Sequence, residues 1–330
     1  GLILTYALEV PKFLKFVTMM AARVESEFNS VERVVQYLKV DTEADEDTPP
    51  EVKKALPATF ASKSTLAFRN YSMRYRDGLP LVLKDVSFTI ADGEKIGIVG
   101  RTGSGKSSIL VSIFRMVEGS SGSILLNGVD ISTLGLRDLR ESMCMIPQDP
   151  FLFSGTLREN IDPFNAVQAD KDVWDALEMV GLKGVVGALP EGLATVMSDG
   201  GGNFSQGQRQ LICMARALLR KARILMLDEA TASIDLETDN KIQAAIRTAF
   251  SHCTVLTIAH RLDTVMDSDR IIVMEKGVVA EIDAPKTLLD NKDGVLSHLV
   301  SRSGNADRLK SIASKSFENL RAIDTKRFLP

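Results

Sequence analysis

Alternating apolar and polar positions predict short strands between residues 66 and 100. From Leu66 the apolar residues recur at every second position, with one shift of phase before Tyr71. Two more strands are expected in the segments LVLKDVSFTI (81–90) and EKIGIVG (94–100). Alternation of this kind is typical of strands with one buried face.

Beyond Gly100 the pattern changes to an alternation of strands and helices. The segment RILMLDEAT (223–231) predicts a buried strand, ETDNKIQAAIRTAF (237–250) a helix, and CTVLTIAH (253–260) a second strand. Strands that alternate with helices form parallel sheets with helices on both faces. The sequence therefore predicts an α/β fold.

The first forty residues have a helical pattern that is too interrupted for a lone membrane span. Glu9, Pro11, Lys12 and Lys15 break an apolar run that is otherwise long enough to cross a bilayer. A charge at the centre of a lipid-facing helix costs about 2.5–3.5 kcal/mol on insertion scales. We interpret residues 1–40 as the end of a transmembrane helix and its cytoplasmic extension. A soluble amphipathic helix packed on a domain is the alternative.

The rest of the chain divides into three parts by composition. Residues 41–64 are acidic, then rich in proline and polar residues, and predict a solvated linker. The main domain is expected over residues 65–302. Residues 303–330 are polar and net basic without a strong period, and predict a tail or an exposed helix.

The composition is that of a globular protein and points away from nucleic acid. Apolar residues make up 45% and charged residues 25% of the chain, and the net charge is −3. No basic field is available to attract a polyanion, so we expect no nucleic-acid partner. Cys144, Cys213 and Cys253 have no metal-type spacing and are expected to be buried thiols.

The segment GRTGSGKS (100–107) is predicted to form a phosphate-binding loop. It matches the pattern G-x-x-x-x-G-K-[ST] and follows an apolar strand, as this motif requires. Its glycines allow backbone N–H groups to surround phosphate oxygens; Lys106 is expected at the β- and γ-phosphates and Ser107 on Mg²⁺. The expected nucleotide contacts are Gly100, Arg101, Thr102, Gly103, Ser104, Gly105, Lys106, Ser107 and Ser108.

A pair of carboxylates follows the strand at residues 224–227. Asp228 is expected at the carboxyl end of that strand, where it would orient Mg²⁺. Glu229, one residue further, can polarise the water that attacks the γ-phosphate. The favourable effect of acids near a helix N-terminus explains one carboxylate but not two.

A second glycine-rich segment, SDGGGNFSQGQRQL (198–211), also runs into a helix and would hold an anion. Together with the phosphate-binding loop, ILMLDEATASID and TIAHRL, it resembles the nucleotide-binding domain of ABC transporters over residues 65 to 300. The resemblance implies a P-loop NTPase with a RecA-like core, an antiparallel β subdomain and a helical subdomain.

The resemblance implies a function for the second anion site. Two such domains face each other head to tail, and each ATP lies between the phosphate-binding loop of one and the signature segment of the other. Ser205, Gly207 and Gln208 would then contact the ATP bound by a partner domain. Phe204 and Gln206 depart from the family's usual LSGGQ, which leaves the efficiency of this half-site open.

The other site residues follow from the resemblance one position at a time. Tyr75 matches the aromatic residue that stacks on adenine, with Tyr71 as a weaker candidate. Gln148 matches the glutamine that approaches Mg²⁺ and the attacking water, and Asp235 the acid that crosses the domain interface. His260 matches the histidine at the γ-phosphate. His252 and His298 match no functional position.

The finer resemblance is to the second nucleotide-binding domain of subfamily C, the multidrug-resistance-associated proteins. It implies a catalytic cassette that keeps Glu229 and works with a first nucleotide-binding domain and two membrane domains. The segment PFLFSGTLRENI (150–161) would be where the membrane domains dock. The expected activity is hydrolysis of ATP with Mg²⁺, coupled to export across a membrane, with the nucleotide-binding domain in the cytoplasm.

Two points stay open in this interpretation. Lys12, Phe13, Lys15 and Phe16 either contact an amphipathic organic anion in the transport cavity or, for the lysines, extend toward the membrane interface. The whole protein is either an exporter or a regulatory or channel-type member in which ATP gates a partner. A soluble ABC ATPase acting on DNA or ribosomes would carry a coiled-coil insertion or two cassettes, and the chain shows neither.

Overall fold

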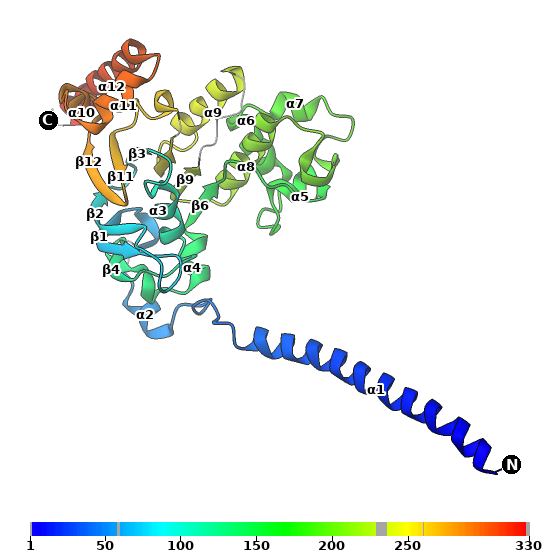
Figure 1. Cartoon of the computed structure of the whole chain (residues 1–330). Helices are drawn as coiled ribbons and strands as arrows, with labels where there is room; N and C mark the ends of the chain where they lie inside the picture. Colours follow the sequence, from blue (N-terminus) through cyan, green and yellow to red (C-terminus); the bar gives the residue numbers. More distant parts are fainter. Residues whose placement is uncertain (1, 58–59, 229–235, 260, 328–330) are drawn as a thin grey trace. The chain divides into compact units, whose positions relative to one another are not determined.

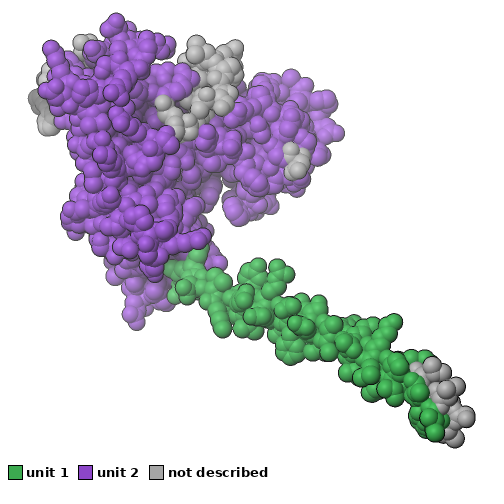
Figure 2. All heavy atoms as spheres, viewed as in Figure 1, with its two compact units in different colours: residues 1–45 green, residues 46–330 purple. Residues whose placement is uncertain are grey.

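The computed structural model describes residues 2–57, 60–228, 236–259 and 261–327. The chain forms two compact units, residues 1–45 and residues 46–330 (Figure 2). The first unit contains the long helix α1 (Leu2–Leu38), which has Pro11 inside it. In the part of the chain that the structure describes, no helix combines the length and hydropathy needed to cross a bilayer.

The second unit is built on a six-stranded sheet in the order β12-β11-β3-β10-β9-β6 (Figure 1). Neighbouring strands are parallel except for the antiparallel pair β11 and β12. This confirms the parallel sheet predicted by the alternation of strands and helices. The strands are β3 (Lys95–Gly100), β6 (Met143–Ile146), β9 (Ile224–Asp228), β10 (Thr254–Ile258), β11 (Arg270–Glu275) and β12 (Val278–Asp283).

A four-stranded antiparallel sheet in the order β2-β1-β4-β5 forms the β subdomain. Side chains of both sheets share one apolar core with α3 (Lys106–Ile113), so the helix that follows the phosphate-binding loop is fixed from two sides. The four strands are β1 (Leu66–Met73), β2 (Leu83–Ile90), β4 (Ser121–Leu126) and β5 (Val129–Asp130).

A helical subdomain packs on a second apolar core, which includes Phe204, Leu211 and Cys213 and extends to β6, β9 and β10 of the six-stranded sheet. Helix α8 contacts both α5 and α6, and α7 packs on α6. The remaining elements between residues 136 and 248 are α4 (Leu136–Glu141), whose Leu139 belongs to the core shared by the two sheets, the short pair β7 (Gly155–Thr156) and β8 (Val196–Met197), α5 (Leu157–Ile161), α6 (Asp170–Met179), α7 (Lys183–Gly187), α8 (Gln206–Leu219) and α9 (Leu236–Thr248).

Three helices at the C-terminal end pack on β11: α10 (Pro285–Asp290), α11 (Val295–Arg302) and α12 (Ala306–Arg327). The sequence predicted a tail or an exposed helix from residue 303. The segment forms a helix, as the second alternative expects, but Leu309 and Ala313 lie one turn apart on α12 and are buried in this third core. The start of α12 is therefore part of the domain.

The predicted linker at residues 41–64 is also only partly solvated. Residues 41–47 are exposed, but Thr48 and Ser64 are buried. The short helix α2 (Pro50–Ala55) and the turn at Phe60–Ser62 bring Val52, Leu56 and Phe60 against the core of the β subdomain. The domain thus begins near residue 46 rather than 65, because these three apolar residues, although isolated in a polar segment, pack against its core.

The three cysteines are free and buried, as predicted. Burial raises the pKa of each thiol above its ordinary value. A raised pKa reduces the thiolate fraction at neutral pH, so these side chains behave as small apolar core residues.

Candidate ATP-binding site

The phosphate-binding loop connects the buried strand β3 to α3. Gly103 and Gly105 have φ values of 78° and 101°, and Gly105 is the N-cap of α3. Residues with a Cβ rarely adopt this left-handed conformation, so glycine is required at both positions. The loop ends at a helix N-terminus, where backbone N–H groups and the helix dipole attract an anion.

Lys106 is buried at the first turn of α3, with 6% of its surface exposed. Its Nζ donates hydrogen bonds to the carbonyl oxygens of Gly100, at 2.8 Å, and Arg101, at 3.2 Å. The ammonium group is therefore held inside the turn of the loop by the loop's own backbone. An ammonium in this place is a fixed positive charge for a phosphate group.

Two serines of the loop test whether a nucleotide fits here. The hydroxyl of Ser104 is buried and has no hydrogen-bond partner among the described residues. A buried polar group without a partner costs about 1–3 kcal/mol, so an anionic acceptor in the loop would remove an unfavourable feature. Ser107 is exposed at the N-terminus of α3, which suits an oxygen ligand of a metal ion. The loop fits a triphosphate.

The other predicted catalytic positions lie at the same edge of the sheet. Ile98 of β3 is in register with Ile258 of β10, which is in register with Asp228 at the end of β9. Asp228 is half-buried, and Gln148 lies two residues beyond the end of β6, the next strand. Since the four strands are parallel, their carboxyl ends meet at one edge, where α/β proteins bind ligands.

Three predicted residues lie outside the described ranges: Glu229, Asp235 and His260. Their sequence positions still relate them to described strands. Glu229 follows the last residue of β9, and His260 comes two residues after the end of β10. Among the described residues, no group of three or more histidine, cysteine or acidic side chains gathers as a metal centre.

The two tyrosine candidates for adenine are separated by the structure. Tyr75 lies just beyond β1; its ring is exposed and its hydroxyl is 3.0 Å from Ser108 Oγ on α3. Tyr71 is buried in the β subdomain, edge-on to Phe68. A bulge in β1 near Asn70 turns Tyr71 inward, so the prediction that Tyr71 could serve adenine is wrong.

The signature segment forms the start of α8 in the helical subdomain. Ser205 is the N-cap, and its Oγ accepts a hydrogen bond from Gln208 N at 3.2 Å. Gln208 Oε1 in turn accepts one from Ser205 N, at 2.9 Å, completing a capping box. Ser205 is nevertheless exposed. The side chain of Gln208, predicted to contact a nucleotide, is thus used to shape the helix terminus.

The departures from the usual signature have a structural context. Phe204 is 8% exposed and belongs to the helical core, so it fills an apolar position as leucine would. Gly207 is buried and Gln206 is half-buried. Further along the same helix, Gln210 Nε2 donates to the backbone oxygen of Gln148 at 3.3 Å. The signature helix is therefore tied to the segment of Gln148.

Two cavities in the described part of the chain border the phosphate-binding loop, and neither is lined by any residue between 198 and 210. One of them, of about 370 Å³, lies between residues 100–104 and α11. Its lining includes His298 and Arg302, for which the sequence predicted no role; nothing in the local pattern of α11 distinguishes them from surface residues.

Comparison with known families agrees with this geometry. Residues 83–232 match the family described as "ABC transporter". "ABC transporter C family member 12" from Dictyostelium discoideum is 49% identical over 328 residues, 98% of this chain and 24% of that protein. "ATP-binding cassette sub-family C member 3" from Homo sapiens is 52% identical over 290 residues, 88% of this chain and 19% of that protein.

A similar fold occurs in a solved structure described as "Structure of a bacterial Atm1-family ABC exporter with ATP bound". It is 30% identical to this chain, with a TM-score of 0.75, and the match covers 85% of this chain and 47% of the other. The chain spans less than a quarter of the length of the two curated relatives above.

Proposed function

Because the chain belongs to the ABC transporter family, and its relatives to the C subfamily, we propose that residues 46–330 are the ATP-hydrolysing domain of a membrane exporter. The observation that carries the proposal is the shared sheet edge. The phosphate-binding loop, Asp228 and Gln148 follow three parallel strands that end there. The assignment of Glu229 and His260 to the same site rests on the sequence.

Each residue has a distinct part in this mechanism. The loop N–H groups and Lys106 hold the β- and γ-phosphates of ATP, while Tyr75 supports the adenine. Ser107, Asp228 and Gln148 would hold Mg²⁺, which neutralises charge on the phosphates when it is bound. Glu229 orients and polarises the attacking water, with His260 at the γ-phosphate. Retention of Glu229 assigns the chain to the second, catalytic cassette of the transporter.

A single chain of this kind completes no site alone. Ser205 is exposed at the N-terminus of a 14-residue helix, but no described cavity joins it to the phosphate-binding loop. The exposed N-cap and its helix dipole suit an anion brought by another molecule. In the proposed assembly Ser205, Gly207 and Asp235 therefore face the ATP held by the first nucleotide-binding domain.

The segment after Gln148 provides a surface for the membrane domains. Phe151 is 71% exposed, an unusual state for a large aromatic side chain. The segment is firmly held, because Asn160 accepts from Phe153 N at 3.0 Å and donates to Phe153 O at 2.9 Å. An exposed apolar residue on a rigid loop is suited to a protein interface. Movement of the Gln148 segment on ATP binding would reach the membrane through this surface.

The first unit supports the membrane assignment in the intact protein. Along α1 the large apolar side chains Phe13, Phe16 and Val31 are all more than half exposed. At about 3.6 residues per turn these three positions lie close together on one face of α1, and an exposed apolar face needs a partner or lipid to cover it. We assign residues 1–40 to the end of the last transmembrane helix, and the nucleotide-binding domain to the cytoplasmic side.

We expect Lys12 and Lys15 to select for anionic substrates. Lys12 Nζ is 2.9 Å from Glu9 Oε1, which neutralises part of its charge, so Lys15 should contribute more. In the full-length transporter, the double variant Lys12→Ala/Lys15→Ala should reduce uptake of an amphipathic organic anion about 10-fold, the worth of one charge-assisted hydrogen bond. Uptake of a neutral substrate and uptake by the control Lys39→Ala should not change; equal loss for both substrates would refute the cavity role.

The proposed function as a whole is tested by uptake into inside-out membrane vesicles that contain the full-length protein. We expect accumulation of a glutathione or glucuronide conjugate that requires ATP and is abolished by replacing ATP with a non-hydrolysable analogue. ATP hydrolysis without any accumulation would instead favour the alternative, a regulatory or channel-type member in which ATP gates a partner.

A further inference from the structure

Residues 46–48, here called the docking strap, lie on the loop that precedes α4. Arg137 N donates to the carbonyl oxygen of Glu46 at 2.9 Å, and the Arg137 guanidinium pairs with the carboxylates of Glu46 and Asp47. Thr48 N donates to Asp138 Oδ2 at 3.2 Å, and this contact with Thr48 lowers the pKa of Asp138. Every residue of the strap therefore contacts the domain.

The centre of this contact is buried and tightly packed. Thr48 is 5% exposed, and its Oγ1 accepts a hydrogen bond from Gly135 N at 2.8 Å. A Cβ added to Gly135 would lie 2.2 Å from Asp47 C and 2.3 Å from Thr48 N, closer than real contacts allow. Gly135 has a φ of −67°, which any residue can adopt. Glycine is needed here for space rather than for backbone conformation.

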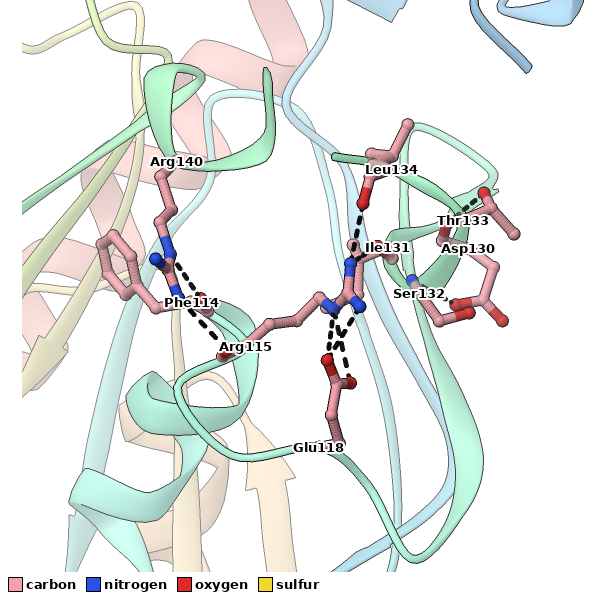
Figure 3. Close-up of polar contacts among 9 residues, drawn as sticks. All are labelled: Phe114, Arg115, Glu118, Asp130, Ile131, Ser132, Thr133, Leu134 and Arg140. Atoms are coloured by element: carbon pink, nitrogen blue, oxygen red, sulfur yellow. Dashed lines mark hydrogen bonds and ion pairs between the residues drawn. The ribbon is translucent and has the colours of Figure 1, made fainter. Parts of the chain in front are cut away.

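The loop that receives the strap is fixed from the other side by a buried arginine. Arg115, 7% exposed, donates through Nη1 to the carbonyl oxygens of Ile131 at 2.9 Å and Leu134 at 2.7 Å (Figure 3). Its Nη2 is 2.8 Å from Glu118 Oε1. Arg140 donates to the backbone oxygens of Phe114 and Arg115, as the same figure shows. This network fixes the end of α3 to the loop.

One peptide group joins the two contacts. The carbonyl of Leu134 and the N–H of Gly135 belong to the same planar unit, which accepts from Arg115 and donates to Thr48. Hydrogen bonds in series of this kind polarise one another. Arg115 comes two residues after the end of α3, and α3 begins at the phosphate-binding loop. A short chain of contacts therefore connects the phosphate-binding loop to the strap.

We propose that the docking strap is a mechanical link by which α3 moves the helix α1 that precedes it in the chain. A linker solvated over its whole length would absorb a displacement of the domain. Docking of residues 46–48 leaves only the exposed residues 39–45 between the domain and the end of α1, so more of the displacement reaches α1. This inference rests on the proposed function, since it assigns to α1 a membrane partner. The positioning residues are Thr48, Gly135 and Arg115, and none of them contacts ATP.

The variant Gly135→Ala in the full-length protein tests the link, because the added methyl group has no room except in the place of the strap. Hydrogen exchange should show faster exchange of residues 46–56 in the variant. The ATP-dependent change of exchange over residues 24–45, expected in the wild type, should be lost. Basal ATP hydrolysis should stay within about 2-fold of the wild type, while substrate transported per ATP hydrolysed falls at least about 5-fold.

Two further variants separate the link from a general loss of structure. Gly184→Ala is a matched control, because Gly184 has a helical backbone and nothing within 4 Å of an added Cβ. Thr48→Val removes the acceptor with little change of volume. It should reproduce the coupling defect of Gly135→Ala, and combining it with Arg115→Lys should cost less than the sum of the two single effects.

These measurements decide whether the docking strap transmits movement from α3 to α1. The proposal is overturned if residues 46–56 stay protected in Gly135→Ala, or if they are released while the ratio of transport to hydrolysis and the exchange of residues 24–45 are unchanged. A wild-type protein that hydrolyses ATP without transport would refute the proposed function instead. The exchange of residues 24–45 with and without ATP would still decide whether the strap transmits movement.

Discussion

ATP turnover stops in the variant Glu229→Gln, while ATP still binds. We expect the hydrolysis rate to fall at least about 10²-fold, the usual contribution of a general base, with ATP affinity within about 2-fold of the wild type. The amide keeps the size of the side chain and its hydrogen-bonding capacity but cannot accept the proton of the attacking water. The measurement is a single-turnover hydrolysis assay together with equilibrium ATP binding on the full-length protein.

The exposed residue Glu191 provides a control for this experiment. Glu191→Gln changes the net charge in the same way and should leave hydrolysis unchanged. If Glu229→Gln hydrolyses ATP at the wild-type rate, Glu229 has no catalytic role, and the assignment of the chain to a catalytic cassette fails with it.

The second large effect is expected from Lys106→Ala. The ammonium group is buried and held by two backbone oxygens of the loop, so its removal takes a fixed positive charge from the phosphate-binding loop. Loss of a charge-assisted contact worth about 1.5–3 kcal/mol should weaken ATP binding about 10- to 100-fold. Hydrolysis should fall by about 10²–10³-fold, because the same charge stabilises the transferring phosphoryl group.

Lys171, an exposed residue of α6, provides the matched control. Lys171→Ala should bind and hydrolyse ATP like the wild type, which shows that loss of one positive charge from the domain is not the cause. Unchanged ATP affinity in Lys106→Ala, measured by equilibrium binding of a fluorescent ATP analogue, would contradict the assignment of the loop as the phosphate site.

The sheet and the phosphate-binding loop were predictable because their signals are local. Strands β3, β9 and β10 are apolar runs bounded by polar residues, and the loop motif lies within eight residues of sequence. Register at the sheet edge then follows from topology alone, since parallel strands place their carboxyl ends together. Gln148 was assigned to the site by the resemblance to ABC transporters rather than by topology, and it lies two residues beyond β6, whose carboxyl end is at the same edge.

The linker and the tail were misjudged because what fixes them is not local. Thr48 is satisfied by Gly135 and Asp138, about ninety positions away, and such a partner leaves no trace in the composition of residues 41–64. Among the described side chains of α12 only Leu309 and Ala313 are buried, and most of their neighbours are polar, a pattern too sparse to predict a packed helix. A short-range sequence pattern describes a segment itself but does not indicate the distant surface of the domain on which the segment packs.

Tyr71 and the signature illustrate two further limits. The phase shift at Tyr71 was visible in the sequence, but only the bulge at Asn70 shows that the ring turns into the core. For the signature, the sequence predicted an anion site at a helix N-terminus, and the structure confirms an exposed N-cap at Ser205. The anion would be brought by a partner domain. Its identity therefore cannot be derived from the sequence or the fold of this chain alone.

Each ATP is expected to lie between two nucleotide-binding domains, and one structure tests this directly. The intact transporter carrying Glu229→Gln should be solved with ATP by cryo-electron microscopy. We expect one ATP at Lys106 and a second, held by the first nucleotide-binding domain, with a phosphate oxygen within hydrogen-bond distance of Ser205 Oγ. A closed assembly in which Ser205 lies far from every bound triphosphate would contradict the account.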